Sequence, residues 1–224
     1  MQKLKNWIFD YRFIFIIFTA IAIIAGIQRY LPPHDFLGRF SHYNNYILFK
    51  NSILHLLEHK DMYIAYEQKG AWDLYKYSPT FAVFMLPYAF LPDLAGLILW
   101  NLTNILLVFY AIKVFPNFTD KNKMLMLWFI LPELLLSAQS AQSNALIAAL
   151  FLLCYTSFEK NKLIAAAVFL GIATCIKPYA AVIGVIFLFY PGKLKFILYS
   201  IISGLVFIAL PLLLTSYTNL YNQY

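Results

Sequence analysis

The chain has 224 residues, of which 62% are hydrophobic, 19% aromatic and only 12% charged, and its mean hydropathy is +0.70. This composition excludes an ordinary soluble domain, which would expose too much apolar surface to water. The net charge of +7 does not indicate nucleic-acid binding, because the basic residues are spread over short loops and form no basic face. We therefore expect an all-α, polytopic helix bundle with membrane lipid as a partner.

Seven apolar segments recur along the chain and are the candidate membrane spans. The first follows Lys3, Lys5 and Arg12, and we interpret it as a retained helix because no clean signal-peptide cleavage site follows it. Several segments are shorter than the roughly 20 residues of a perpendicular span, so they extend into flanking residues or line a cavity. The candidate spans are 13–31, 94–113, 124–138, 143–158, 163–177, 179–190 and 196–215.

An eighth apolar stretch, 79–91, contains Pro79 and Pro87. If it does not cross, ten of the seventeen basic residues lie on the side of the N-terminus, as the positive-inside rule requires. If it does cross, that bias disappears. We therefore expect 79–91 to lie in, or dip into, the outer interface. The ten inner basic residues are Lys3, Lys5, Arg12, Lys113, Lys121, Lys123, Lys160, Lys162, Lys193 and Lys195.

The chain is therefore expected to form one membrane domain, 1–224, whose residues 32–93 form a long outer loop between the span 13–31 and the remaining spans, 94–215. Within this loop, Tyr43–His59 has apolar residues at helical spacing with polar residues between them. The pattern predicts an amphipathic helix that rests on the outer leaflet. The inner side has only lysine-rich connectors, so the sequence places the functional site outside.

Asp35 follows the first span almost at once, after Pro32, Pro33 and His34. A carboxylate at the boundary between membrane and water can have a raised proton affinity, and can accept a proton from a hydroxyl nucleophile. The alternative is a solvated loop aspartate or a helix cap, which is the commoner role of such a residue.

The stretch from Trp72 to Pro79 is dense in aromatic residues and contains Lys76. Trp72, Tyr75 and Tyr77 are candidates for shaping a sugar site, and Lys76 can neutralise a phosphate as a point charge. An interfacial aromatic belt explains the same composition equally well.

Polar residues also occur where two later spans end. Gln139, Gln142 and Asn144 lie between the spans 124–138 and 143–158, where their amides could bind hydroxyls or phosphate oxygens, or cap a tight turn. Lys177 lies at the outer end of an apolar helix, directly before Pro178. A charge in that position needs a partner. Lys177 could pair with the phosphate of a bound lipid, or its side chain could snorkel to the lipid headgroups.

Taken in order, these features resemble glycosyltransferase family 87, the polyprenol-phosphate-mannose-dependent mannosyltransferase-like proteins of the GT-C class. The resemblance starts at the loop aspartate and continues through a short series of motifs as far as Pro178. Those motifs are Tyr43-Asn-Asn-Tyr, Asp61-Met-Tyr63, Tyr75-Lys-Tyr-Ser-Pro-Thr-Phe-Ala82, Trp100-Asn-Leu-Thr-Asn104, Gln139…Gln142-Ser-Asn144 and Ile176-Lys-Pro178.

The resemblance implies a GT-C-like bundle with juxtamembrane helices, Asp35 as the catalytic residue, and substrate contacts from Tyr43 and Asn44. It implies a multi-pass protein of a bacterial-type inner membrane that moves a hexose, mannose by preference, from a polyprenyl phosphate to a glycan or glycolipid hydroxyl. No cofactor is expected, although carboxylates such as Asp35 and Asp61 leave a divalent metal open. Family members are usually longer, which implies a chain truncated at its C-terminus.

Two other classes of function stay open on the sequence. A transporter or lipid flippase would also need polar groups near the membrane, and Glu133, beside Pro132 within a span, is the feature that favours it. A non-catalytic scaffold or degenerate fragment is favoured by the short length of the chain.

Overall fold

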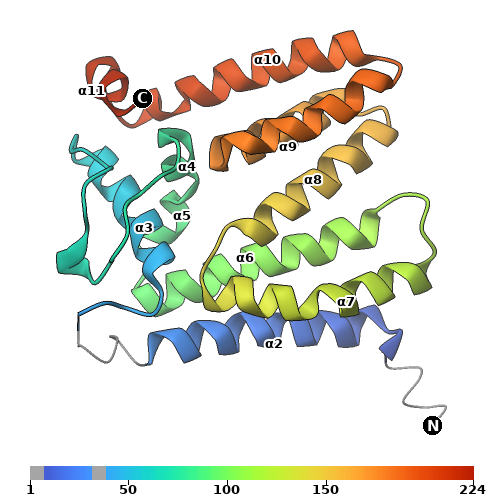
Figure 1. Ribbon diagram of the computed structural model, residues 1–224, viewed down its shortest axis with the longest axis horizontal. Coiled ribbons are helices and arrows are strands. Elements are labelled where there is room, and N and C mark those ends of the chain that lie inside the picture. Colours follow the sequence, from blue (N-terminus) through green and yellow to red (C-terminus); the bar gives the residue numbers. More distant parts are fainter. Residues whose placement is uncertain (1–7, 32–38) are drawn as a thin grey trace.

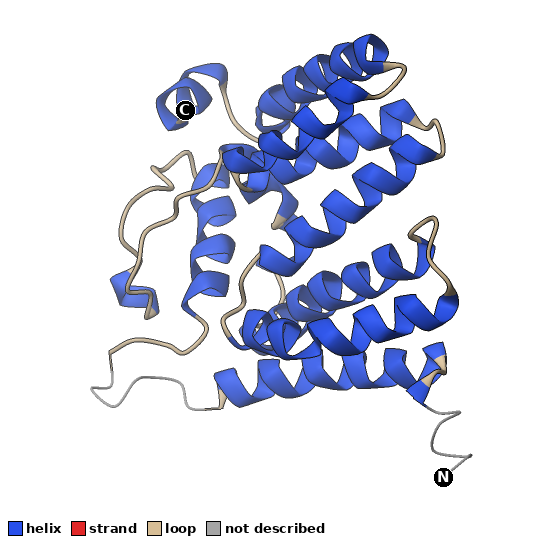
Figure 2. Cartoon of the chain, turned by 45° about the vertical axis from the view of Figure 1, so that its right-hand side comes forward, coloured by secondary structure: helices blue, strands red, loops and turns tan. Residues whose placement is uncertain are grey.

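The structure, a computed structural model, describes residues 8–31 and 39–224. Every regular element in these two ranges is a helix, which confirms the all-α prediction (Figures 1 and 2). In chain order the elements are α2 (Tyr11–Tyr30), α3 (Asn44–Leu57), η1 (Glu67–Lys69), α4 (Pro79–Phe84), α5 (Leu86–Ala89), α6 (Asp93–Val114), α7 (Asp120–Gln139), α8 (Asn144–Glu159), α9 (Leu163–Ile176), η2 (Pro178–Phe189), α10 (Lys193–Ala209), η3 (Leu210–Leu213) and α11 (Tyr217–Gln223).

The helix boundaries follow from local sequence. Asp10 caps α2 by accepting a hydrogen bond from the backbone N–H of Arg12, at 2.8 Å. Ser78 caps α4, with Pro79 at the first helical position, where its missing N–H costs nothing. Helix α9 ends where Lys177 takes an extended conformation, because the ring of Pro178 disfavours a helical residue before it.

The long helices run back and forth and place their connections at two opposite ends of the molecule (Figure 1). The lysine end holds the connections 115–119, 160–162 and 190–192. The loop end holds 39–92, the turn 140–143, Lys177 and the segment 210–224. This is the alternation that the spacing of the lysines predicts.

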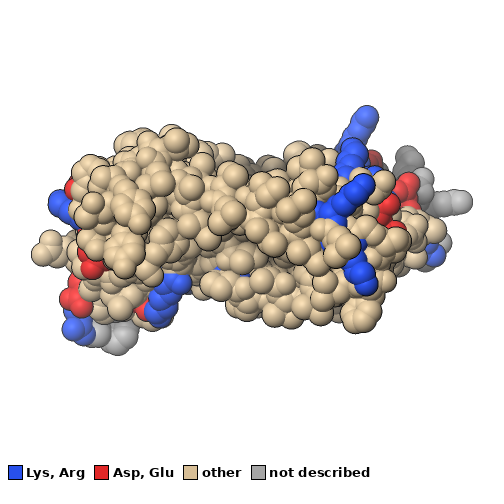
Figure 3. All heavy atoms as spheres, turned by 90° about the horizontal axis from the view of Figure 1, so that it is seen from above, with Lys and Arg blue, Asp and Glu red and all other residues tan. Residues whose placement is uncertain are grey.

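All seven predicted spans appear as helices. Among the described residues, three helices are long and apolar enough to cross a membrane: Tyr11–Tyr30, Asp93–Val114 and Lys193–Leu213. Helices α8, α9 and η2 are apolar but shorter, so the number of seven spans stays a prediction. On the face seen in Figure 3, charged side chains gather at the two ends and leave an uncharged band between them.

Residues 79–91 form two short helices rather than one, with Met85 between them and Pro87 inside the second. Together α4 and α5 are too short to cross a bilayer, which needs roughly 20 helical residues. They lie at the loop end, as the distribution of charge predicts.

Helix α3 differs from the prediction of an amphipathic helix on the outer leaflet. Four consecutive residues, Tyr46 to Phe49, are buried, so the helix has no single apolar stripe facing lipid. Its rings pack inside the protein: the Phe49 ring centroid lies 5.0 Å from Phe81 and 5.6 Å from Trp100. The described loop residues therefore form a packed cap with its own core, continuous with α6.

Candidate functional site

A polar pocket of about 440 Å³ opens at the loop end. It is formed by four parts of the chain that are distant in sequence: the last turn of α2, the residues around the start of α3, Trp72, and the end of α7 with the turn that follows. The residues that line it are Arg29, Phe40, Ser41, His42, Asn44, Asn45, Trp72, Gln139, Ser140 and Gln142.

Hydrogen bonds fix the walls of the polar pocket. Asn45 Nδ2 donates to the carbonyl of Ser140 at 2.7 Å, which ties α3 to the turn after α7. Asn44 Oδ1 accepts from the backbone N–H of Trp72 at 2.8 Å, and Gln139 Nε2 donates to Gln28 Oε1 at 2.9 Å. These hydrogen bonds therefore join all four parts of the chain that form the pocket.

The turn between α7 and α8 is held in place by Trp100 of α6. Trp100 is almost fully buried, and its Nε1 donates to the carbonyl of Ala141 at 3.0 Å. Ala141 has φ 50°, a left-handed conformation that a non-glycine residue keeps only when its surroundings hold it there. The indole hydrogen bond thus sets where Gln139 and Gln142 stand.

Three polar atoms at the pocket are buried without a hydrogen-bond partner: Ser41 Oγ, Asn44 Nδ2 and Arg29 Nε. Ser41 and Asn44 are only 7% and 6% exposed. Each such atom costs about 1–3 kcal/mol unless something satisfies it. A ligand rich in hydroxyl or phosphate oxygens would supply the missing partners, so the pocket is suited to binding a polar ligand.

Lys177 lies at the same end and is linked to the first residue of α8, which follows the turn that lines the polar pocket. Its Nζ donates to Asn144 Oδ1 at 2.6 Å and lies 5.9 Å from the ring centroid of Tyr179. Asn144 follows Gln142 by two residues, so one turn serves both the pocket and Lys177. Within 8–31 and 39–224 no carboxylate pairs with Lys177, whereas Lys50 pairs with Asp93 at 2.7 Å.

Other residues proposed from the sequence lie outside the polar pocket. Tyr75 is 2% exposed and donates its hydroxyl to the carbonyl of Ser78, and burial raises its pKa well above the ordinary value, so the phenol stays neutral. Tyr77 packs edge-on against Phe49, with ring centroids 5.1 Å apart. Lys76 points to the surface, where it pairs with Asp73 at 2.6 Å.

Tyr43 is also buried beside the pocket rather than in its lining, with its ring centroid 5.7 Å from that of Tyr30. Asp35 lies outside the described residues, although Arg29 and Phe40, on either side of that segment, both line the pocket. Within the described ranges no three or more His, Cys, Asp or Glu residues gather in a way that could hold a metal ion.

The structure adds residues that the sequence did not single out, chiefly Arg29, Ser41 and Asn45. Arg29 had a signal: it is a cation in the last turn of an apolar span, where a charge is costly unless partnered. Asn45 lies in the Tyr43-Asn-Asn-Tyr motif, which was given a substrate contact only at Tyr43 and Asn44. Ser41 had no signal, because short polar residues in a loop are common.

The sequence model of glycosyltransferase family 87 matches residues 75–224. The chain belongs to glycosyltransferase family 87. Family 87 membership makes it a membrane glycosyltransferase of the hexosyltransferase class. The matched region includes Gln139, Gln142 and Lys177 but begins after Asp35 and Asn44. Searches of curated proteins and of solved structures found no match.

Proposed function

We propose that this protein transfers a hexose, mannose by preference, from a polyprenyl phosphate to a hydroxyl of a glycan or glycolipid. The observation that carries the proposal is the polar pocket, with its unsatisfied Ser41 Oγ and Asn44 Nδ2, at the same end of the bundle as the cation of Lys177. A sugar would occupy the pocket and supply hydrogen-bond partners. The phosphate that links it to lipid would then lie near Lys177.

The chemistry assigned to these residues is a single displacement. The acceptor oxygen bonds to the anomeric carbon while the bond between that carbon and the phosphate oxygen breaks. Asp35 takes the proton of the acceptor hydroxyl as general base. The electron pair leaves with the lipid phosphate, whose growing negative charge Lys177 offsets. Lys76 is a weaker candidate for that role, because Asp73 already neutralises it.

We assign the loop end to the outer face of a bacterial-type inner membrane and the lysine end to the cytoplasm. The positive-inside rule supports this orientation, because the connections and adjoining helix ends at the lysine end hold Lys113, Lys121, Lys160, Lys162 and Lys193 with few balancing acids. Transport is less well supported than transfer. The acid that favoured transport, Glu133, is exposed on the surface of the described bundle rather than facing its interior.

Transfer of radiolabelled mannose from polyprenyl-phosphate-mannose, in membranes that contain this chain, tests the proposal directly. We expect labelled glycan or glycolipid with the parent chain and its loss in Asp35→Asn. Full transfer by Asp35→Asn would remove Asp35 as the base. Absence of transfer with every hexosyl polyprenyl phosphate, from a correctly folded protein, would overturn the proposed donor.

Trp72→Ala is expected to raise the KM for the sugar substrate roughly fivefold, which corresponds to about 1 kcal/mol of aromatic contact. The indole is 63% exposed at the pocket, so its loss should leave folding intact. Trp72→Phe should recover most of the affinity. Leu74→Ala, which removes a 43% exposed side chain two residues away, is the matched control. An unchanged KM in Trp72→Ala would exclude stacking by this ring.

A further inference from the structure

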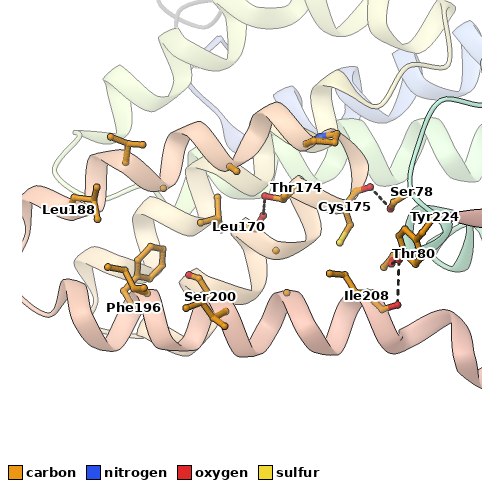
Figure 4. Close-up of a pocket in the computed structure, with 18 residues that line it drawn as sticks. Ser78, Thr80, Leu170, Thr174, Cys175, Leu188, Phe196, Ser200, Ile208 and Tyr224 are labelled. Carbon is orange, nitrogen blue, oxygen red and sulfur yellow. Dashed lines mark hydrogen bonds between the residues drawn. The ribbon is translucent and has the colours of Figure 1, made fainter. Parts of the chain in front are cut away.

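Two cavities are lined by both α9 and α10, and they differ in charge. The first, of about 530 Å³, lies between α9, η2 and α10, and no Asp, Glu, Lys, Arg or His lines it (Figure 4). The second, of about 630 Å³, lies at the lysine end, where α9 and α10 begin. We call it the lysine-end cavity. It is lined by Lys162, Lys195 and Tyr199 together with mainly apolar residues, so this cavity can select a ligand by charge.

The two cations of the lysine-end cavity, Lys162 and Lys195, are exposed, and no Asp or Glu lines the cavity with them. All three ion pairs between described residues lie at the loop end, where they involve Lys50, Lys60 and Lys76. Basic side chains gather at the lysine end of the molecule (Figure 3). Helix α9 also begins there without an acidic residue in its first turn, so its dipole adds to the positive potential. The cavity therefore attracts anions.

Tight turns fix the backbone that presents these lysines. Asn161 has φ 55°, and the backbone N–H of Lys162 donates to the carbonyl of Ser157 at 2.8 Å, which closes the end of α8. Gly192 has φ 87°, and its carbonyl accepts from the backbone N–H of Phe196 at 3.1 Å, which starts α10. The site is thus largely preorganised, which lowers the entropy cost of binding.

A buried aromatic cluster joins the two turns. The ring centroid of Phe158 lies 5.2 Å from that of Phe196 and 4.3 Å from that of Phe187. Phe158 belongs to the last turn of α8, and Phe196 to the first turns of α10. All three rings are buried. The cluster therefore holds the two lysine-bearing segments at a fixed spacing.

Further along α9 the lining of the lysine-end cavity becomes apolar, with Ile164, Val168 and Phe169. Val168 follows Lys162 by six residues, which corresponds to about 9 Å along a helix. Ile164 is 63% exposed, so the cavity opens to the surroundings of the bundle. Beside α10, a candidate membrane span, those surroundings are lipid. The cavity is therefore amphiphilic, with its cations at the end of the bundle and apolar walls towards the middle.

We propose that the lysine-end cavity binds an anionic phospholipid of the adjacent leaflet, with its phosphate at Lys162 and Lys195 and an acyl chain along Ile164 and Val168. Charge complementarity selects this occupant, because two cations without carboxylate partners match an anionic headgroup at the membrane boundary. The apolar walls match an acyl chain, which free phosphate lacks. The inference goes beyond the proposed transfer and does not depend on it. A lipid held there would stabilise the start of the helix whose other end leads to Lys177.

Native mass spectrometry of the purified full chain tests the site. The probes are dioleoyl phosphatidylglycerol, which is anionic, and dioleoyl phosphatidylcholine, which has the same acyl chains but no net charge. We expect the parent chain to bind phosphatidylglycerol about tenfold more tightly. Lys162→Gln combined with Lys195→Gln should remove about tenfold of that affinity. The matched control is Lys121→Gln with Lys123→Gln, which removes two charges from α7 at the same end but outside the cavity.

The control pair should bind phosphatidylglycerol as the parent chain does. An equal loss in both double variants would overturn the site and leave only diffuse attraction by positive charge. Equal binding of the two lipids by the parent chain would also overturn it. Displacement of the lipid by inorganic phosphate would mean a phosphate site without an acyl chain. Ala165→Phe, which fills part of the apolar lining, should weaken binding as well, and unchanged binding would exclude the acyl chain from the cavity. The thermal midpoint without added lipid checks that each variant is folded.

Discussion

Lys177→Met is expected to lower the rate of hexosyl transfer about 100-fold, or roughly 2.7 kcal/mol in the barrier, the lower end of what one preorganised donor to a developing negative charge contributes. The lysine is held at Asn144 by a 2.6 Å hydrogen bond, so its charge is already in place before the phosphate bond breaks. Methionine keeps much of the length of the side chain but removes the charge. The measurement is kcat for mannose transfer at saturating donor.

Lys177→Arg should retain part of the rate, because the charge stays while the shape of the donor changes. Lys60→Met is the matched control: Lys60 is another cation at the loop end, but it pairs with Glu58 at 2.7 Å. We expect its rate to equal that of the parent chain. An equal loss in both variants would mean that general positive charge, and not Lys177 at the site, supports transfer.

Gly96→Ala is expected to have the largest effect on stability, about 3 kcal/mol. A Cβ at this position in α6 would overlap the hydroxyl oxygen of Tyr46 and come within 3.0 Å of the carbonyl of Tyr88. That hydroxyl donates to the same carbonyl, at 3.2 Å, in a buried contact between α3 and α5. The added methyl group therefore breaks the junction of the cap with α6, and the thermal midpoint in detergent should fall by roughly 6–12 °C.

Gly204→Ala is the matched control, because it makes the same chemical change in a helix where the new Cβ meets nothing within 4 Å. It should hold or raise the thermal midpoint, since alanine is the better helix former by about 1 kcal/mol. Tyr46→Phe combined with Gly96→Ala should recover part of the loss by removing the overlapping oxygen. If Gly96→Ala had the same thermal midpoint as the parent chain, α3 could not pack on α6 as described.

The helix bundle was predictable because lipid imposes simple requirements on a chain that crosses it. A chain that crosses it must be helical and apolar, and charges are confined to the connections. Those requirements identified the seven helices that match the predicted spans, and the placement of lysines alone assigned 79–91 to the loop end. The seven helices are α2, α6, α7, α8, α9, η2 and α10. The same requirements failed for α3, whose burial comes from contacts with Phe81 and Trp100 rather than from its own spacing.

The candidate site was predictable only in part. Asn44, Trp72, Gln139 and Gln142 do meet in one pocket, and their polarity at the ends of helices was the signal. Tyr75 carried the same aromatic signal but is buried in the core. Composition cannot distinguish an aromatic ring that faces a ligand from one that fills the interior, because both need only apolar area and a hydrogen-bonded hydroxyl.

The sequence by itself therefore determined the class of fold, the course of the chain between two ends and the family, because hydropathy and charge act along the chain. Only the tertiary structure decided which polar groups share a pocket, that Ser41 Oγ and Asn44 Nδ2 lack hydrogen-bond partners there, and that Lys177 bonds to Asn144 while no carboxylate of the described residues pairs with it. Those properties depend on distances between residues far apart in sequence, which packing sets.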